Sequence, residues 1–210
     1  MEERIFKDEL KYLISYPDGF REGGKYPLLI FLHGRSARLE STEKLHQYPS
    51  LAFLREHQNE KGFILLAPHC KSGNWSEWIK MVIQLLETFR ELPYIDNTRW
   101  YLTGLSLGGY GTWELATFRA DWFAAAMPLC GGGIPATAKE LGKLPIRAFH
   151  GLCDTTVDPS ISLQMVSAVN LVGGDAELIL FPKEPHNCAE RVYTDKKNID
   201  WLFSFTNERD

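Results

Sequence analysis

The 210-residue sequence lacks the features that define several large classes of protein. Its four cysteines, Cys70, Cys130, Cys153 and Cys188, are too few and too widely spaced for a disulfide scaffold. No apolar run approaches the roughly 18 residues of a membrane span. The first residues, MEERIFK, do not form the apolar segment of a secretory signal. We therefore expect a cytoplasmic protein that is not inserted in a membrane.

The chain also lacks a surplus of positive charge. It carries 23 Lys and Arg against 27 Asp and Glu, a net charge of −4, and its pI is about 5.9. Such a balance gives no electrostatic attraction for nucleic acid or for an anionic membrane. There is no repeat, low-complexity tract or linker, so residues 1–210 are expected to form a single domain.

The few Cys and His residues permit a metal-site hypothesis. His150-x-x-Cys153 and His186-x-Cys188, with Cys70, have spacings that zinc ligands can have. The chain has no Cys-x-x-Cys pair, and His186 has a better use described below. We predict that no metal is bound, and we leave open whether Cys153 and Cys188 form a bridge.

Apolar runs alternate with segments of helical periodicity along most of the chain. Runs that are apolar throughout suit strands covered on both faces, as in a parallel sheet. The alternation predicts an α/β fold, with a mostly parallel central sheet and helices on both faces. Strands are expected over 9–16, 26–32, 63–68, 123–129, 145–149 and 176–181. The central strand is expected to begin at Trp100, and residues 37–48 are expected to be a loop. Helices are expected from Pro49 to before Gly62, over 76–92, 107–119, 159–172 and 197–206, with one short helix within 134–144.

The central strand ends in a Gly-x-Ser-x-Gly sequence, Gly104 to Gly108, and leads directly into a helix. This context predicts a sharp strand-to-helix turn that strains the backbone of Ser106 and raises its hydroxyl above the sheet edge. Side chains at the two glycines would collide with neighbouring chain. The helix from Leu107 directs its N–H groups and positive dipole end to the same place.

A serine hydroxyl becomes nucleophilic when a base and an acid lie within reach. In a parallel sheet, the carboxyl ends of the strands share one edge, and Ser106, Asp154 and His186 each follow a strand in the order expected for such a turn. Asp158 competes with Asp154, but it precedes Pro159 and resembles a helix N-cap. We therefore predict a catalytic triad of Ser106, Asp154 and His186.

The remaining histidines are less suited to the role of the base. His46 and His57 lie far from any strand end, while His33 and His150 precede glycine at strand ends. For the last two we predict structural hydrogen bonds.

Stabilising an oxyanion requires two backbone donors. The N–H of Leu107 is one by its position after the serine, and the N–H of Arg35, after the strand ending at Leu32, is the other candidate. Trp75 is expected in a loop, where it either walls the substrate pocket or packs in a core. Trp78 is expected in a helix core.

These residues resemble the α/β-hydrolase superfamily, and more closely its phospholipase/carboxylesterase-like group, which includes predicted peptidases and polyhydroxybutyrate-depolymerase-like proteins. The resemblance is carried by FLHG at 31–34, APHC at 67–70 with Trp75, YLTGLSLGGYGTW at 101–113, CGG at 130–132, HG at 150–151 with Asp154 and Val157, and PH at 185–186. It implies the same triad and oxyanion donors. The chain is expected to have no room for a lid domain, which argues against long-chain lipid substrates. His69 and Leu107 depart from the family pattern, since the family often has Gln and Met there.

We expect a serine carboxylesterase that hydrolyses small soluble short-chain esters without a cofactor. The alternatives are an acetyl or feruloyl esterase acting on plant polysaccharide, an acyl thioesterase, or a ligand-binding module without turnover. Peptidase activity is less expected, since amides are harder substrates and nothing marks a peptide groove. The sequence leaves the acyl chain, the alcohol and the oligomeric state open.

Overall fold

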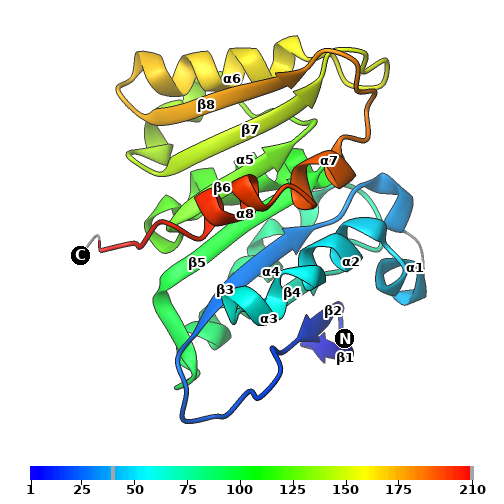
Figure 1. The fold of residues 1–210 in the computed structure, drawn as a ribbon, viewed down its shortest axis with the longest axis vertical. Coiled ribbons are helices and arrows are strands. Elements are labelled where there is room, and N and C mark those ends of the chain that lie inside the picture. Colours follow the sequence, from blue (N-terminus) through cyan, green and yellow to red (C-terminus); the bar gives the residue numbers. More distant parts are fainter. Residues whose placement is uncertain (39–40, 209–210) are drawn as a thin grey trace.

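A central sheet of eight strands organises the computed structural model, which describes residues 1–38 and 41–208 (Figure 1). The strand order is β1-β2-β4-β3-β5-β6-β7-β8. Strands β3 to β8 are parallel, whereas β1 and β2 are antiparallel to their neighbours. The strands are β1 (Glu2–Phe6), β2 (Leu10–Ser15), β3 (Tyr26–Leu32), β4 (Ile64–Pro68), β5 (Ile95–Leu105), β6 (Ala125–Leu129), β7 (Pro145–Gly151) and β8 (Asp175–Phe181).

Helices cover both faces of this sheet (Figure 1). One face packs against α4 (Trp75–Arg90), α5 (Leu107–Arg119), α6 (Ser160–Leu171) and the 3-10 helix η3 (Pro135–Leu141). The other packs against α2 (Pro49–Glu56), α7 (Ala189–Tyr193) and α8 (Lys196–Leu202). The short elements are η1 (Arg35–Ala37), α1 (Glu43–His46), α3 (Gln58–Lys61) and η2 (Ala120–Trp122). The predicted α/β class, with a mostly parallel sheet and two helical layers, is confirmed.

The structure contains elements that the sequence pattern did not predict. Strand β1 is polar and exposed and pairs with β2 only at the sheet edge, so it has no buried face to leave a hydrophobic pattern. The stretch 37–48, expected as a loop, holds part of η1 and helix α1, and residues 39–40 of it lie outside the described residues. Helix α7 spans five residues, too few for a helical period to stand out.

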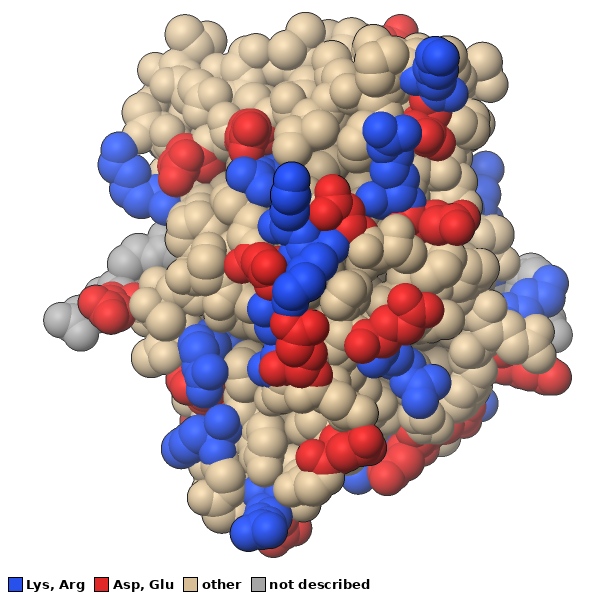
Figure 2. Space-filling model, viewed as in Figure 1, with Lys and Arg blue, Asp and Glu red and all other residues tan. Residues whose placement is uncertain are grey.

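Charges of both signs are interspersed on the face shown in Figure 2. Several form ion pairs between elements, such as Arg147 with Glu177 at 2.8 Å and Lys61 with Asp200. Across residues 1–38 and 41–208, no helix combines the length and the apolar character needed to cross a bilayer.

Candidate active site

The turn between β5 and α5 holds Ser106 in a strained backbone conformation. Its φ of 58° and ψ of −117° lie in a region that non-glycine residues rarely occupy. Two backbone hydrogen bonds maintain it: the Ser106 N–H donates to Leu129 O at 2.9 Å, and Tyr110 N–H donates to Ser106 O at 3.0 Å. The serine hydroxyl therefore projects from a rigid support at the carboxyl edge of the sheet.

Close packing explains the two glycines that flank this serine. A β-carbon on Gly104 would lie 2.6 Å from Leu32 O on the neighbouring strand β3, and one on Gly108 would collide with the same oxygen. Any side chain at these positions would push β5 and α5 away from β3. The glycines thus keep Ser106 next to the loop that follows β3.

A chain of two hydrogen bonds links Ser106 to His186 and Asp154. His186 Nε2 lies 2.7 Å from Ser106 Oγ, and His186 Nδ1 lies 2.6 Å from Asp154 Oδ2. The imidazole is 25% exposed, whereas the Asp154 side chain is fully buried. The structure therefore brings the three predicted residues together in the order that general-base activation of a serine requires.

Asp154 is fixed by its own turn. Its Oδ1 accepts hydrogen bonds from the N–H groups of Thr156 at 2.8 Å and Val157 at 2.9 Å. Burial raises the pKa of this carboxyl, but the hydrogen bonds from Val157, His186 and Thr156 outweigh it and leave the pKa below its ordinary value. The exposed Asp158 instead accepts from Ser160 N–H at 2.8 Å, at the start of α6.

The two proposed oxyanion donors both flank Ser106. Leu107 follows it directly, and Arg35 follows Gly34, where a β-carbon would lie 3.6 Å from Ser106 Cβ. Across residues 1–38 and 41–208, neither the Arg35 nor the Leu107 N–H has a protein acceptor. Both groups are therefore available to a substrate oxygen.

Trp75 is placed differently from the expectation of a loop residue. It is the first residue of α4, and Asn74 and Glu77 form a capping box around it. The side chain is 1% exposed, and its Nε1 donates to His33 O at 3.1 Å. Trp75 thus braces the loop that carries Gly34 and Arg35, and it also lines a cavity next to Leu107. Trp78 is buried in α4, as expected.

His33 anchors the same loop as a neutral ring. Its Nδ1 donates to Gly34 O at 2.8 Å and its Nε2 accepts from Cys70 N–H at 3.0 Å, contacts that require a single ring proton. Burial lowers the pKa of His33 from 6.5 to about 4. His69, which departs from the family pattern as Leu107 does, packs against His33 at 5.5 Å between ring centres.

We expect this buried histidine to make the protein less stable in mild acid. Because the unfolded chain takes up a proton near pH 6.5 and the folded chain only near pH 4, the stability present above pH 6.5 is lost progressively as the pH falls toward 4. The loss amounts to about 2 kcal/mol at pH 5. Urea unfolding of wild type and His33→Asn at pH 7 and pH 5 measures it. The variant should lose about 2 kcal/mol less over this interval, and equal losses would contradict the assignment.

The free thiol of Cys188 contacts Cys130 and not Cys153, with which a bridge was considered above. Cys188 Sγ lies 3.2 Å from Cys130 Sγ, while Cys153 is exposed and donates to Pro182 O. The hydrogen bond between the buried thiols lowers the pKa of Cys130 and raises that of Cys188. Cys130, His150 and Asp154 form a cluster whose ligand atoms all lie within 4.8 Å of one another. The cysteines of the zinc hypothesis are not part of this cluster.

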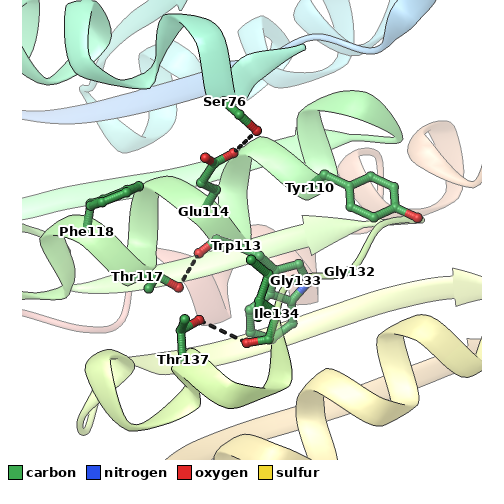
Figure 3. Close-up of a pocket in the computed structure, with 10 residues that line it drawn as sticks. All are labelled: Ser76, Tyr110, Trp113, Glu114, Thr117, Phe118, Gly132, Gly133, Ile134 and Thr137. Atoms are coloured by element: carbon green, nitrogen blue, oxygen red, sulfur yellow. Dashed lines mark hydrogen bonds between the residues drawn. The ribbon is translucent and has the colours of Figure 1, made fainter.

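A groove made of two neighbouring cavities runs along α5 from Leu107, the residue after Ser106. One cavity, of about 330 Å³, reaches Leu107 and Trp75. It shares Ser76, Tyr110 and Glu114 with a second cavity of about 360 Å³ (Figure 3). The second cavity is lined by Ser76, Tyr110, Trp113, Glu114, Thr117, Phe118, Gly132, Gly133, Ile134 and Thr137. Sequence reasoning missed these residues, although Tyr110, Glu114 and Phe118 recur at the four-residue spacing of one helix face.

Comparison with known proteins places this geometry in a superfamily. No protein-family model matches the chain. A solved structure described as a thermostable esterase matches with a TM-score of 0.88 and 27% identity, covering 98% of this chain and 63% of the other. The chain is an α/β-hydrolase. The resemblance on which the sequence analysis relied is thereby confirmed at the level of the superfamily.

Several curated relatives of this α/β-hydrolase are esterases by name. A probable feruloyl esterase C from Aspergillus flavus is 24% identical over 172 residues, 78% of this chain and 62% of the relative. A bifunctional acetylxylan esterase/xylanase from Neocallimastix patriciarum is 27% identical over 139 residues, 63% of this chain and 20% of the relative. The chain thus spans less than two thirds of the length of these proteins.

Proposed function

We propose that this α/β-hydrolase is a serine carboxylesterase. The observation that carries the proposal is the hydrogen-bonded chain from Ser106 Oγ through His186 to Asp154. Ser106 Oγ attacks the ester carbonyl carbon while His186 Nε2 takes its proton. His186 then returns that proton to the departing alcohol, and an acyl-enzyme remains. A water molecule activated by His186 hydrolyses the acyl-enzyme and regenerates Ser106.

The negative charge that develops on the carbonyl oxygen is stabilised by backbone donors. We assign this role to the N–H groups of Leu107 and Arg35. Leu107 begins the 13-residue helix α5, whose dipole adds to them. One such donor is worth about 3 kcal/mol of transition-state stabilisation. These donors and the triad carry the reaction without a cofactor.

The groove favours a second, more specific candidate among the possible substrates. The departing alcohol must lie near His186, which protonates it. No described residue of the loop carrying His186 lines either cavity, while Leu107 does. The groove therefore receives the acyl side of the ester. Its two joined cavities far exceed what an acetyl group fills, so we propose that an aromatic acyl group, such as the feruloyl group in the names of the relatives, is accepted beside short acyl groups.

A substrate panel tests both levels of this proposal. Wild type should hydrolyse p-nitrophenyl acetate and butyrate near neutral pH, and should also hydrolyse methyl ferulate. Turnover of the short esters alone would restrict the enzyme to small acyl groups. A preference for acyl thioesters would favour the thioesterase alternative. Lack of turnover on every member would favour a ligand-binding module and contradict the esterase assignment.

The groove can be tested by substitution at its aromatic wall near Leu107. Tyr110 lines both cavities and lies four residues after Ser106, about one helical turn away (Figure 3). We expect Tyr110→Ala to lower kcat/KM for methyl ferulate about fivefold, the worth of one aromatic contact, with p-nitrophenyl acetate much less affected. Leu163→Ala is the matched control, because Leu163 is 52% exposed on α6 and does not line either cavity. Equal losses of kcat/KM on both substrates would contradict the placement of the aromatic acyl group in this groove.

A further inference from the structure

A second histidine contacts the carboxylate oxygen that His186 uses. His150, the residue before the end of β7, places its Nε2 3.0 Å from Asp154 Oδ2. Both side chains are fully buried. Asp154 Oδ2 is therefore shared between His186 on one side, at 2.6 Å, and His150 on the other.

The partners of His150 determine that Nε2 carries a proton. The same Nε2 lies 3.0 Å from Val157 O, a carbonyl that can only accept a hydrogen bond. On the other side of the ring, Nδ1 lies 2.7 Å from Ser162 Oγ, whose hydroxyl donates to Gly131 O at 2.7 Å. The Nε2 proton is shared between Val157 O and Asp154 Oδ2. His150 is thus a donor to Asp154, never an acceptor from it.

These contacts connect Asp154 to the rigid part of the fold. Ser162 belongs to α6, and Gly131 follows β6, the strand whose last residue, Leu129, holds the Ser106 N–H. His150 itself lies within a strand paired to β6 and β8. The carboxylate is held at Oδ1 by its own turn and at Oδ2 by the sheet.

We propose that His150 is a positioning residue that orients Asp154 and moderates its attraction for the proton on His186. This inference rests on the proposed function. A donor that takes up part of the charge on Asp154 Oδ2 leaves less of that charge to stabilise His186 in its protonated form.

Loss of the His150 contact should therefore increase the affinity of His186 for protons. The affinity of His186 for protons should increase in either case, because a neutral and a charged His150 ring both reduce the negative potential at His186. Among the described residues, the titratable groups near this site include Cys130 after β6, Asp158 ahead of α6 and Tyr110 on α5; Cys188 contacts Cys130 and interacts with Glu184. All of these groups are unchanged in the variants below.

Two amide variants form a matched pair for the test. In His150→Gln the amide nitrogen takes the place of Nε2 and can still donate to Asp154. In His150→Asn the shorter amide takes the place of Nδ1, so it keeps the hydrogen bond to Ser162 and loses the one to Asp154. The titration of His186 is followed by nuclear magnetic resonance, and its signals are assigned by their absence in His186→Ala. This measurement gives the protonation midpoint of His186 and requires no turnover.

We expect the His186 titration midpoint to move up by about one pH unit in His150→Asn and to stay near wild type in His150→Gln. The acidic limb of kcat/KM should move with it, and kcat should fall about tenfold in His150→Asn with KM little changed. Ser162→Ala keeps the Nε2 contact and should retain the wild-type midpoint. Equal midpoints in wild type and His150→Asn would overturn the proposal, whereas an inactive wild type would overturn only the proposed function.

Discussion

Ser106→Ala is expected to lower kcat/KM for p-nitrophenyl butyrate by about five orders of magnitude. The substitution removes the oxygen that lies 2.7 Å from His186 Nε2 and that would form the acyl-enzyme in the proposed reaction. A φ of 58° is strained for any residue other than glycine. Circular dichroism and thermal unfolding must therefore show that the variant is folded when its rate is measured. The residual rate should come only from the oxyanion donors and binding.

An exposed serine provides the control for this variant. Ser167 on α6 is exposed, and Ser167→Ala should keep the wild-type rate. Retention of more than about a hundredth of the activity by folded Ser106→Ala would mean that another group is the nucleophile.

Asp154→Asn is expected to lower kcat by about four orders of magnitude while the fold is retained. The two backbone N–H groups at Oδ1 require an acceptor, so the Asn oxygen must occupy that position. The amide nitrogen then takes the place of Oδ2, donates to His186 Nδ1 and loses the hydrogen bond from His150 Nε2. This forces the ring proton onto Nε2, which faces Ser106 and can no longer accept a proton from it.

The neighbouring aspartate offers a close control for Asp154→Asn. Asp158 is four residues away and bonds to the start of α6 rather than to His186. Asp158→Asn should change kcat by no more than about threefold. Similar losses in the two variants would show that Asp154 does not orient the base.

The proximity of Ser106, Asp154 and His186 was predictable because two general rules converge on it. The glycines around Ser106 indicate a sharp turn, and parallel strands bring their following loops to one edge. The choice of Asp154 over Asp158 followed from distance to the strand end. The structure places Asp154 beside His186, whereas Asp158 accepts from Ser160 N–H just ahead of α6, whose N-cap is Pro159 rather than the expected Asp158.

Other parts of the site left no usable signal in the sequence. The role of Trp75 depends on where α4 begins, and an Asn-x-x-Glu capping box could have located that start. The contacts of Cys188 with Cys130 and of His150 with Asp154 depend on side-chain directions at strand ends. Those directions are set by tertiary packing rather than by residue type or spacing.

Intact-protein mass spectrometry after incubation with a p-nitrophenyl alkylphosphonate tests the central claim most directly. The phosphorus accepts the serine oxygen and releases p-nitrophenol, so the adduct mimics the tetrahedral intermediate in the site of Leu107 and Arg35. We predict one adduct per chain, located on Ser106 by peptide mapping, and no adduct in Ser106→Ala. An unlabelled wild type, or a label on another residue, would contradict the assignment of Ser106 as nucleophile.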